Sequence, residues 1–196
     1  MKALVTGGAG FIGSHIVDLL TPSVLSALER RLLLFFTGSS RNASEILAEQ
    51  KEAMQDRSSG VSRRLRAIRN LVDPAREALL SSDLDRFGEI LHEGWQLKRS
   101  LSARVSSERI DTVYEAACAA GAMGGKLAGA GGGGFLLLFS RDGAQESIRR
   151  TMLPLGLEEL HFRFDHHGSR VVYNDPWFDT DETGGLRWSF VAGNAA

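Results

Sequence analysis

A cluster of glycines between two apolar segments constrains the fold of this chain more than any other feature. Residues 129–134 read GAGGGG, so that only Ala130 interrupts Gly129, Gly131, Gly132, Gly133 and Gly134. The flanking residues 123–127 and 135–140 are typical of strands. Five glycines give up substantial conformational entropy and bring no side chains to bury, so a plain hairpin would not need them. They allow positive φ and suit either an anion bound by backbone N–H groups or close packing of another backbone.

The other segments switch between strand and helix periodicity. The pattern predicts strands at residues 32–37, 157–165 and 170–173, helices at residues 42–56, 84–103, 108–120 and 142–153, and a further helical stretch at residues 65–72. Asp73-Pro74 either interrupts that stretch or opens the next helix, since proline suits a first turn. We interpret Thr21-Pro22-Ser23 as a break. This order predicts an α+β fold, with an antiparallel sheet covered by helices on one face.

The composition excludes several classes of function. The formal net charge is −1, and no apolar run approaches the roughly 20 residues of a membrane span, so we expect neither nucleic acid nor a membrane as partner. Cys118 is the single cysteine, which excludes an intrachain disulfide and fits a reducing cytoplasm. Its alanine neighbours predict a small buried filler rather than a nucleophile. His166 and His167 are adjacent in a turn and are not spaced for a shared metal ion, so we expect no metal site. The missing apolar run and the single cysteine lead us to expect a soluble, cytoplasmic protein.

The beginning of the chain carries a second glycine motif, TGGAGFIG, between a short apolar strand and a helix. Gly7, Gly10 and Gly13 would let the backbone approach a pyrophosphate at the helix N-terminus. The segment resembles the first βα unit of the nucleotide-sugar epimerases and dehydratases, and this resemblance implies that these glycines contact NAD. Residues 1–22 are therefore predicted to form a Rossmann-like βα fragment.

The features that should follow this motif are missing. An acid is needed about 20 residues further on, and residues 30–35 contain none. The catalytic pair of that family is a tyrosine and a lysine four residues later, but Tyr114 is followed at this spacing by Cys118, and Tyr173 by Trp177. We therefore do not expect NAD to bind. The fragment either packs on the rest of the chain or is left over from a fusion.

Four later segments resemble one family of kinases. They are LLLFFTGSSRNASEIL, FGEILHEGWQLKRSLS, IDTVYEAACAAGAMGGKLAGAGGGGFLLLF and FRFDHHGSRVVY. Together they resemble the C-terminal domain of the GHMP kinases, in particular the D-glycero-D-manno-heptose 7-phosphate kinases. The resemblance implies a ferredoxin-like α+β domain at residues 28–173, ATP-dependent phosphorylation of a heptose phosphate, and a glycine loop beside the phosphate-transfer site. Residues 174–196 form a polar tail for which the sequence predicts no role.

Basic side chains offer a candidate clamp for a sugar phosphate. At about 100° per residue, Lys98 lies between Phe87 and Leu91 on the apolar face of its helix, and Arg99 flanks the same face. A lysine in that place either extends past its neighbours into solvent or meets an anion at a domain junction. Lys98 and Arg99 are therefore candidate phosphate ligands, and Arg41, at a strand-to-helix junction, is a further one. We assign no catalytic residue.

The other half of a GHMP kinase site is not found in these residues. The resemblance implies ATP and Mg²⁺, but the nucleotide loop, P-x-x-x-G-L-G-S-S-A-like, has only a faint echo in Gly38-Ser39-Ser40, and the catalytic acid would lie in the N-terminal half. Because phosphoryl transfer depends on that loop and the metal, we expect negligible kinase activity from this chain alone. A separate N-terminal kinase half or a homo-oligomer are the partners that would complete it. Two alternatives stay open, a relative of the NAD-dependent epimerases and a non-catalytic module that keeps an anion-binding loop.

Overall fold

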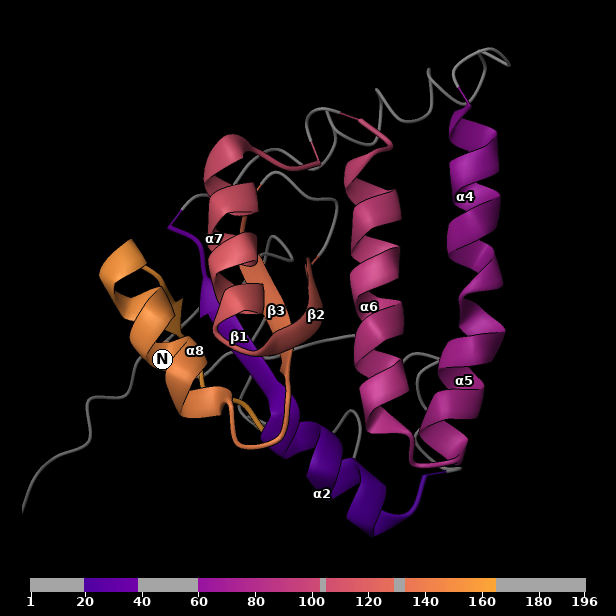
Figure 1. Ribbon diagram of the computed structural model, residues 1–196, viewed down its shortest axis with the longest axis horizontal. Coiled ribbons are helices and arrows are strands. Elements are labelled where there is room, and N and C mark those ends of the chain that lie inside the picture. Colours follow the sequence, from indigo (N-terminus) through magenta and orange to yellow (C-terminus); the bar gives the residue numbers. More distant parts are fainter. Residues whose placement is uncertain (1–19, 39–59, 103–104, 129–132, 165–196) are drawn as a thin grey trace, which may run out of the picture. The chain divides into compact units, whose positions relative to one another are not determined.

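A computed structural model describes residues 20–38, 60–102, 105–128 and 133–164 (Figure 1). In chain order the elements are α2 (Pro22–Arg31), β1 (Leu32–Phe36), α4 (Val61–Asn70), α5 (Val72–Leu80), α6 (Leu84–Arg99), α7 (Glu108–Ala119), β2 (Ala122–Leu127), β3 (Phe135–Ser140), α8 (Gln145–Met152), the 3-10 helix η1 (Leu153–Leu155) and β4 (Glu158–Glu159). The predicted helix at 42–56, the strand at 170–173, the tail and residues 1–19 of the predicted Rossmann-like fragment lie outside the described residues. Within the described ranges, no helix is both long enough and apolar enough to cross a membrane.

The four strands form one antiparallel sheet in the order β2-β3-β1-β4. β1 pairs with β3 along its whole length. β2 pairs with the other side of β3, with a bulge between Ala122 and Gly124. β4 adds only two residue pairs at the far side of β1, so it is shorter than the strand predicted at residues 157–165. The α+β fold and the antiparallel sheet are confirmed.

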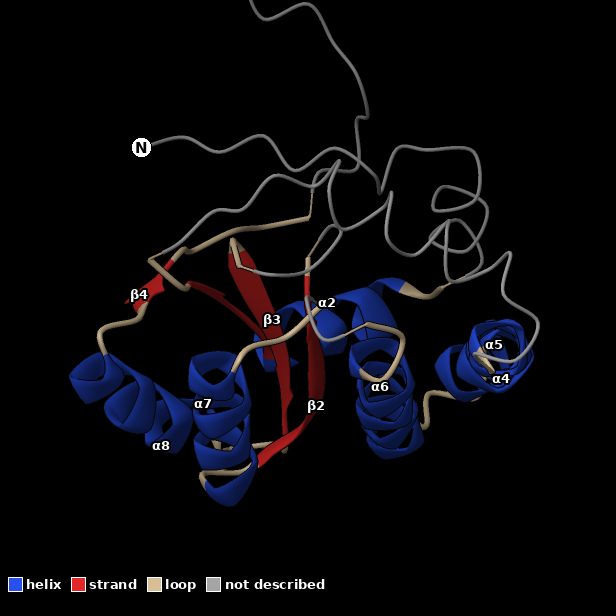
Figure 2. Ribbon diagram, turned by 90° about the horizontal axis from the view of Figure 1, so that it is seen from above, coloured by secondary structure: helices blue, strands red, loops and turns tan. Residues whose placement is uncertain are grey.

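α7 and α8 cover one face of the sheet (Figure 2). Because side chains alternate along a strand, Leu136 and Leu138 of β3 point to the same face, and both are fully buried there. Ile148 and Met152 of α8 are also fully buried in this cluster, as their helical spacing predicts. This apolar cluster is the main core of the described part of the chain.

A second apolar cluster forms where α2 and the beginning of α6 meet the sheet. Phe139, which alternates with Leu138 along β3, packs there with Val24 and Leu28 of α2 and with Leu84 of α6. α2 therefore covers Phe139, whose side chain points to the face of β3 opposite that of Leu138.

α2 begins where the sequence was interpreted as a break. The hydroxyl of Thr21 caps the helix by accepting a hydrogen bond from the Val24 amide at 3.4 Å. Pro22 occupies the first helical position, where a missing N–H costs nothing and the fixed φ favours the helix. The interpretation of Thr21-Pro22-Ser23 as a break is therefore wrong. Pro74 likewise lies in the first turn of α5, so the second of its two readings is correct.

Arg31, the last residue of α2, joins three elements at this end of the sheet. Its Nε donates to the carbonyl oxygen of Ser140 at 2.8 Å, and its Nη2 donates to Oδ1 of Asp85 at 2.6 Å. The guanidinium also lies over the ring of Phe139, 4.6 Å from its centroid. Because the side chain is buried, its charge needs these partners, and Arg31 thereby fixes α2 against β3 and α6.

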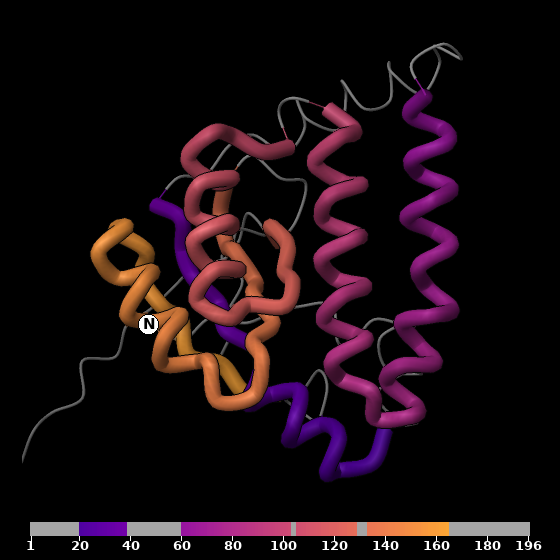
Figure 3. The backbone as a smooth tube through the Cα atoms, viewed as in Figure 1, coloured from indigo at the N-terminus to yellow at the C-terminus, as the bar shows by residue number. Residues whose placement is uncertain are grey.

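α6 packs directly on the backbone of β2, and the two run side by side (Figure 3). A Cβ atom at Gly124 would strike the carbonyl oxygen of Gly88 and would lie 2.6 Å from the amide nitrogen of His92. A Cβ atom at Gly88 would lie 2.8 Å from Cβ of Met123 and 2.9 Å from Cδ1 of Phe139. Only glycines allow this approach, so Gly88 and Gly124 set the separation of helix and strand. α4 and α5 pack on α6.

Two glycines of α6 offer a matched test of this contact. We expect Gly88→Ala to lower the free energy of unfolding by about 1–3 kcal/mol, because the added methyl group has no space. Gly94→Ala should instead leave stability unchanged or raise it by up to about 1 kcal/mol through helix propensity, since its Cβ would meet only Leu71 Cδ1 at 3.6 Å. Urea unfolding followed by circular dichroism measures both, and equal effects would contradict the assigned role of Gly88.

Candidate phosphate-binding site

The two ends of the glycine loop are held by hydrogen bonds to neighbouring strands. The Ala128 amide donates to the carbonyl oxygen of Phe135 at 2.8 Å, which extends the pairing of β2 and β3 by one step. The carbonyl oxygen of Gly134 accepts from both the amide and the hydroxyl of Thr37, each at 2.9 Å. Gly133 and Gly134 have φ values of 148° and 92°, which favour glycine. The loop therefore leaves the sheet from fixed ends.

Several of the predicted site residues lie outside the described ranges. These are Gly129, Ala130, Gly131 and Gly132 of the loop, Arg41, and Gly7, Gly10 and Gly13 of the first motif. Their assignments stay predictions. Gly133, Gly134, Lys98 and Arg99 are the predicted residues that the structure does describe.

Lys98 lies in the last turn of α6, and Lys126 of β2 is a positive charge that acts on it. Burial lowers the pKa of Lys98, and the positive charge of Lys126 lowers it further. Lys126 is exposed on β2, opposite Leu137 of β3, and precedes the glycine loop by only a few residues. The structure therefore brings together two lysines that are 28 positions apart in the sequence.

The contact between α6 and β2 explains why these lysines meet near the loop. Gly124 lies against Leu91, with 3.1 Å from its ideal Cβ position to Leu91 Cβ. Lys98 follows Leu91 by seven residues, about 10 Å along a helix, and Ala128 follows Gly124 by four, about 13 Å along a strand. The end of α6 is thus level with the beginning of the glycine loop.

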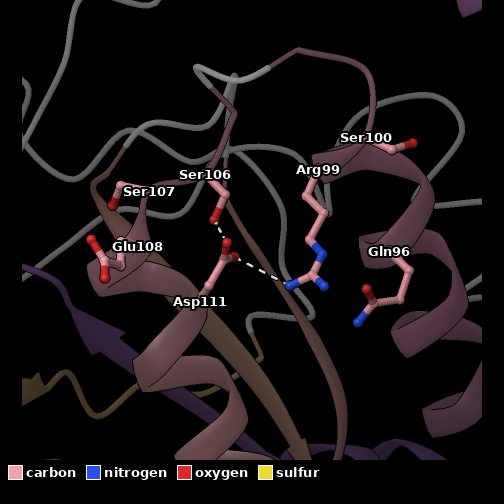
Figure 4. Close-up of a pocket in the computed structure, with 7 residues that line it drawn as sticks. All are labelled: Gln96, Arg99, Ser100, Ser106, Ser107, Glu108 and Asp111. Atoms are coloured by element: carbon pink, nitrogen blue, oxygen red, sulfur yellow. Dashed lines mark hydrogen bonds and ion pairs between the residues drawn. The ribbon is translucent and has the colours of Figure 1, made fainter.

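Arg99 turns away from Lys98 toward α7. Its Nη1 lies 3.3 Å from Oδ1 of Asp111, and the same carboxylate oxygen accepts a hydrogen bond from the Ser106 hydroxyl at 2.7 Å. These groups border a polar hollow of about 560 Å³ between the end of α6 and the beginning of α7 (Figure 4). It is lined by Gln96, Arg99, Ser100, Ser106, Ser107, Glu108 and Asp111. The structure thus does not bring Lys98 and Arg99 together as one clamp, because a carboxylate on α7 engages Arg99.

A buried polar chain behind this hollow was not predicted from the sequence. The hydroxyl of Tyr114 lies 2.9 Å from Nδ1 of His92, and Nε2 of Gln96 lies 3.4 Å from Nε2 of the same ring. Burial raises the pKa of Tyr114, so this hydroxyl keeps its proton. Burial also raises the pKa of the Cys118 thiol, which agrees with the expectation that Cys118 is not a nucleophile. These groups join α6 to α7 and hold the end of α6 in place.

Lys126 is the residue of this site that sequence reasoning missed. Its position between Gly125 and Leu127 in a strand marks it as an outward residue, which is a weak signal because most strands carry one. Its partner Lys98 comes from a different element, and the close approach of Gly88 to Gly124 could not be inferred from spacing alone.

Comparisons with known proteins agree with this arrangement. Residues 75–154 match the family model described as GHMP kinases C terminal. The chain is 34% identical over 152 residues to the bifunctional fucokinase/GDP-fucose pyrophosphorylase of Arabidopsis thaliana, which covers 77% of this chain and 14% of that protein. It is 34% identical over 116 residues to the D-glycero-alpha-D-manno-heptose 7-phosphate kinase of Campylobacter jejuni, covering 59% of this chain and 34% of the kinase.

Solved structures share the fold. The mevalonate kinase of L. major in complex with R-mevalonate superposes with a TM-score of 0.60 at 22% identity, over 65% of this chain and 40% of the kinase. A putative sugar kinase from Campylobacter jejuni gives a TM-score of 0.52 at 25% identity, over 74% of this chain and 40% of that one. The fold is thus shared with 40% of each of these two chains. Residues 75–154 thus match a GHMP kinase C-terminal domain, and the chain spans less than half the length of each of these relatives.

The Thr37 hydroxyl allows a test of the anchored loop end. We expect Thr37→Val to lower the free energy of unfolding by about 1 kcal/mol, the usual net value of one hydrogen bond, because the carbonyl oxygen of Gly134 loses one of its two donors. The variant should also speed hydrogen exchange of the amide of residue 37, which donates to the same carbonyl oxygen, as measured by NMR. Thr37→Ser keeps the hydroxyl and should restore slow exchange. Equal exchange in all three proteins would show that this hydroxyl does not hold the loop.

Proposed function

We propose that this domain is the acceptor-binding and phosphate-binding half of an ATP-dependent sugar kinase, with a heptose phosphate such as D-glycero-D-manno-heptose 7-phosphate as the acceptor. The observation that carries the proposal is the glycine loop, which leaves β2 and returns to β3 from ends fixed by Thr37 and Phe135. Backbone N–H groups in a glycine-rich turn can form a concavity for phosphate oxygens. The heptose 7-phosphate kinase relative, at 34% identity, supports the choice of acceptor.

In the proposed reaction a sugar hydroxyl attacks the γ-phosphorus of ATP. A new P–O bond forms as the bond from the γ-phosphorus to the β,γ-bridging oxygen breaks, and ADP leaves with that oxygen. The hydroxyl proton passes to a base that we place outside this domain, with the ATP loop. The domain's own part is to hold the acceptor and stabilise charge on the transferred group, which is the main catalytic contribution in phosphoryl transfer.

ATP and Mg²⁺ enter the proposal through the family. In the part of the chain that the structure describes, no group of three His, Cys, Asp or Glu side chains could hold a metal ion. The family resemblance leads us to place Mg²⁺ with the nucleotide loop of an N-terminal half. That half, on another chain or on a further segment, is the partner that the proposal requires.

A turnover assay tests the division of labour. We expect the 196-residue chain alone to give no ATP-dependent phosphorylation of heptose 7-phosphate above background, against the roughly 1–100 s⁻¹ typical of kinases. The reason is that this domain supplies neither the nucleotide loop nor the base. Coupled measurement of ADP release gives the rate. An ordinary kinase rate from the chain alone would contradict the proposed division.

A chimera tests the activity itself. Residues 28–173 replace the corresponding region of the Campylobacter jejuni heptose 7-phosphate kinase, and the unaltered kinase is the control. We expect the chimera to phosphorylate heptose 7-phosphate, at a reduced rate because the domain interface is not its own. A folded, ATP-binding chimera that phosphorylates only fucose or mevalonate would replace the acceptor. One that transfers phosphate to none of the three would favour a non-catalytic module.

A further inference from the structure

Lysine is rare in this chain, yet two lysines lie together beside the glycine loop. The sequence has 23 basic residues, of which only Lys2, Lys51, Lys98 and Lys126 are lysines. Lys98 and Lys126 come from α6 and β2, and their charges interact. Arginine favours planar, bidentate partners, whereas a lysine ammonium is a compact point charge with three rotatable donors. Two such groups can share the oxygens of one tetrahedral anion.

Other basic groups at contacts between elements are paired with carboxylates. Arg31 meets Asp85 at 2.6 Å, Arg99 meets Asp111 at 3.3 Å, and Arg149 meets Glu159 at 2.8 Å. Lys126 differs from these arginines, because it forms no ion pair with any residue in the described ranges and its charged neighbour is another cation. The positive charge of Lys126 disfavours the ionised form of Lys98, and a dianion bound beside Lys98 would favour that form.

The backbone contacts around the pair fix the two elements from which these side chains extend. Lys126 is fixed by the ladder between β2 and β3, where it lies opposite Leu137. Lys98 is fixed because α6 rests on β2 at Gly88 and Gly124. Neither element can move away to relieve the repulsion without breaking those contacts. A site whose cations are in place before the ligand arrives binds with less ordering cost.

We propose that Lys98 and Lys126 together bind the phosphate group that the acceptor already carries, so that this domain selects phosphorylated sugars over neutral ones. The inference rests on the proposed function and deepens it, because it names residues that determine the class of acceptor. In this proposal Lys126 takes the place of Arg99 as the second phosphate ligand beside Lys98.

Binding to the intact 196-residue chain tests this pair. The probes are D-glycero-D-manno-heptose 7-phosphate, the same heptose without phosphate, and ATP, each titrated by calorimetry at fixed ionic strength. We expect Lys126→Gln to weaken binding of the phosphorylated heptose about tenfold, the loss of one charge-assisted hydrogen bond, and to leave the neutral heptose unchanged. Arg86→Gln removes an equal charge from an exposed ion pair with Glu89 on the same helix and should change affinity less than about twofold.

A second readout follows the lysines themselves. Reductive ¹³C-methylation labels only four lysine side chains, whose NMR signals report each pKa. We expect Lys126→Gln to raise the pKa of Lys98, since the repelling charge is removed, and the phosphorylated heptose to raise it in the unaltered chain. Because a deprotonated Lys98 no longer attracts phosphate, affinity should fall as pH rises through the lowered pKa of Lys98.

The outcomes separate this inference from the proposed function. If Lys126→Gln binds the phosphorylated heptose as tightly as the unaltered chain, or weakens both heptoses equally, the pair does not hold the acceptor's phosphate. If it weakens ATP alone, the pair serves the nucleotide. If the unaltered chain binds the phosphorylated heptose no more tightly than the heptose without phosphate, the inference is wrong. In each case the turnover of the chimera decides separately whether the domain belongs to a heptose phosphate kinase.

Discussion

The contact between two glycines, Gly88 on α6 and Gly124 on β2, determines where the rest of this domain can place its functional groups. At this point a helix lies against a strand with no side chain between them. A larger residue at either position would push α6 outward, and every side chain along the helix would move with it. The apolar residues of α6 then could not reach the sheet, and Lys98 would no longer lie over β2. The glycines are therefore needed for packing first and for the site as a consequence.

The two ends of this helix and strand have different chemistry. At the first end, Arg31 binds Asp85 and the carbonyl oxygen of Ser140 and lies over Phe139, so its charge is matched by partners within the fold. At the other end, where α6 is level with the beginning of the glycine loop, the positive charge of Lys126 contributes to lowering the pKa of Lys98. The first end is thus anchored by ion pairing and apolar packing, and the other end is where we propose that a ligand binds.

Much of the fold could be predicted from the sequence because its elements have clear periodicity. β1, β2, β3, α6, α7 and α8 lie close to their predicted ranges, and Ile148 and Met152 are buried as expected. α2 was missed because Thr21-Pro22 reads as a break, although a capping hydroxyl followed by proline also opens a helix. β4 was overestimated because alternation alone does not show whether a neighbouring strand offers hydrogen bonds.

The candidate site could be predicted only in part. A helical wheel placed Lys98 on the apolar face of its helix, and in the structure burial lowers the pKa of Lys98. The same wheel placed Arg99 beside it, but a wheel contains no information about α7, whose Asp111 engages Arg99. Lys126 was missed because its relation to Lys98 depends on how α6 crosses β2. Such a relation follows from the Gly88–Gly124 contact, which is a tertiary fact rather than a pattern in the sequence.

Two lysines side by side are a cost that the fold carries when no anion is present. Partial burial and mutual repulsion both favour the neutral form of Lys98. The domain tolerates this because α6 and β2 are held by apolar clusters and by a contact between backbones, neither of which depends on charge. A rigid apolar scaffold that carries two cationic side chains at one end suits the phosphate site that we propose, and the contact between Gly88 and Gly124 determines where those side chains lie.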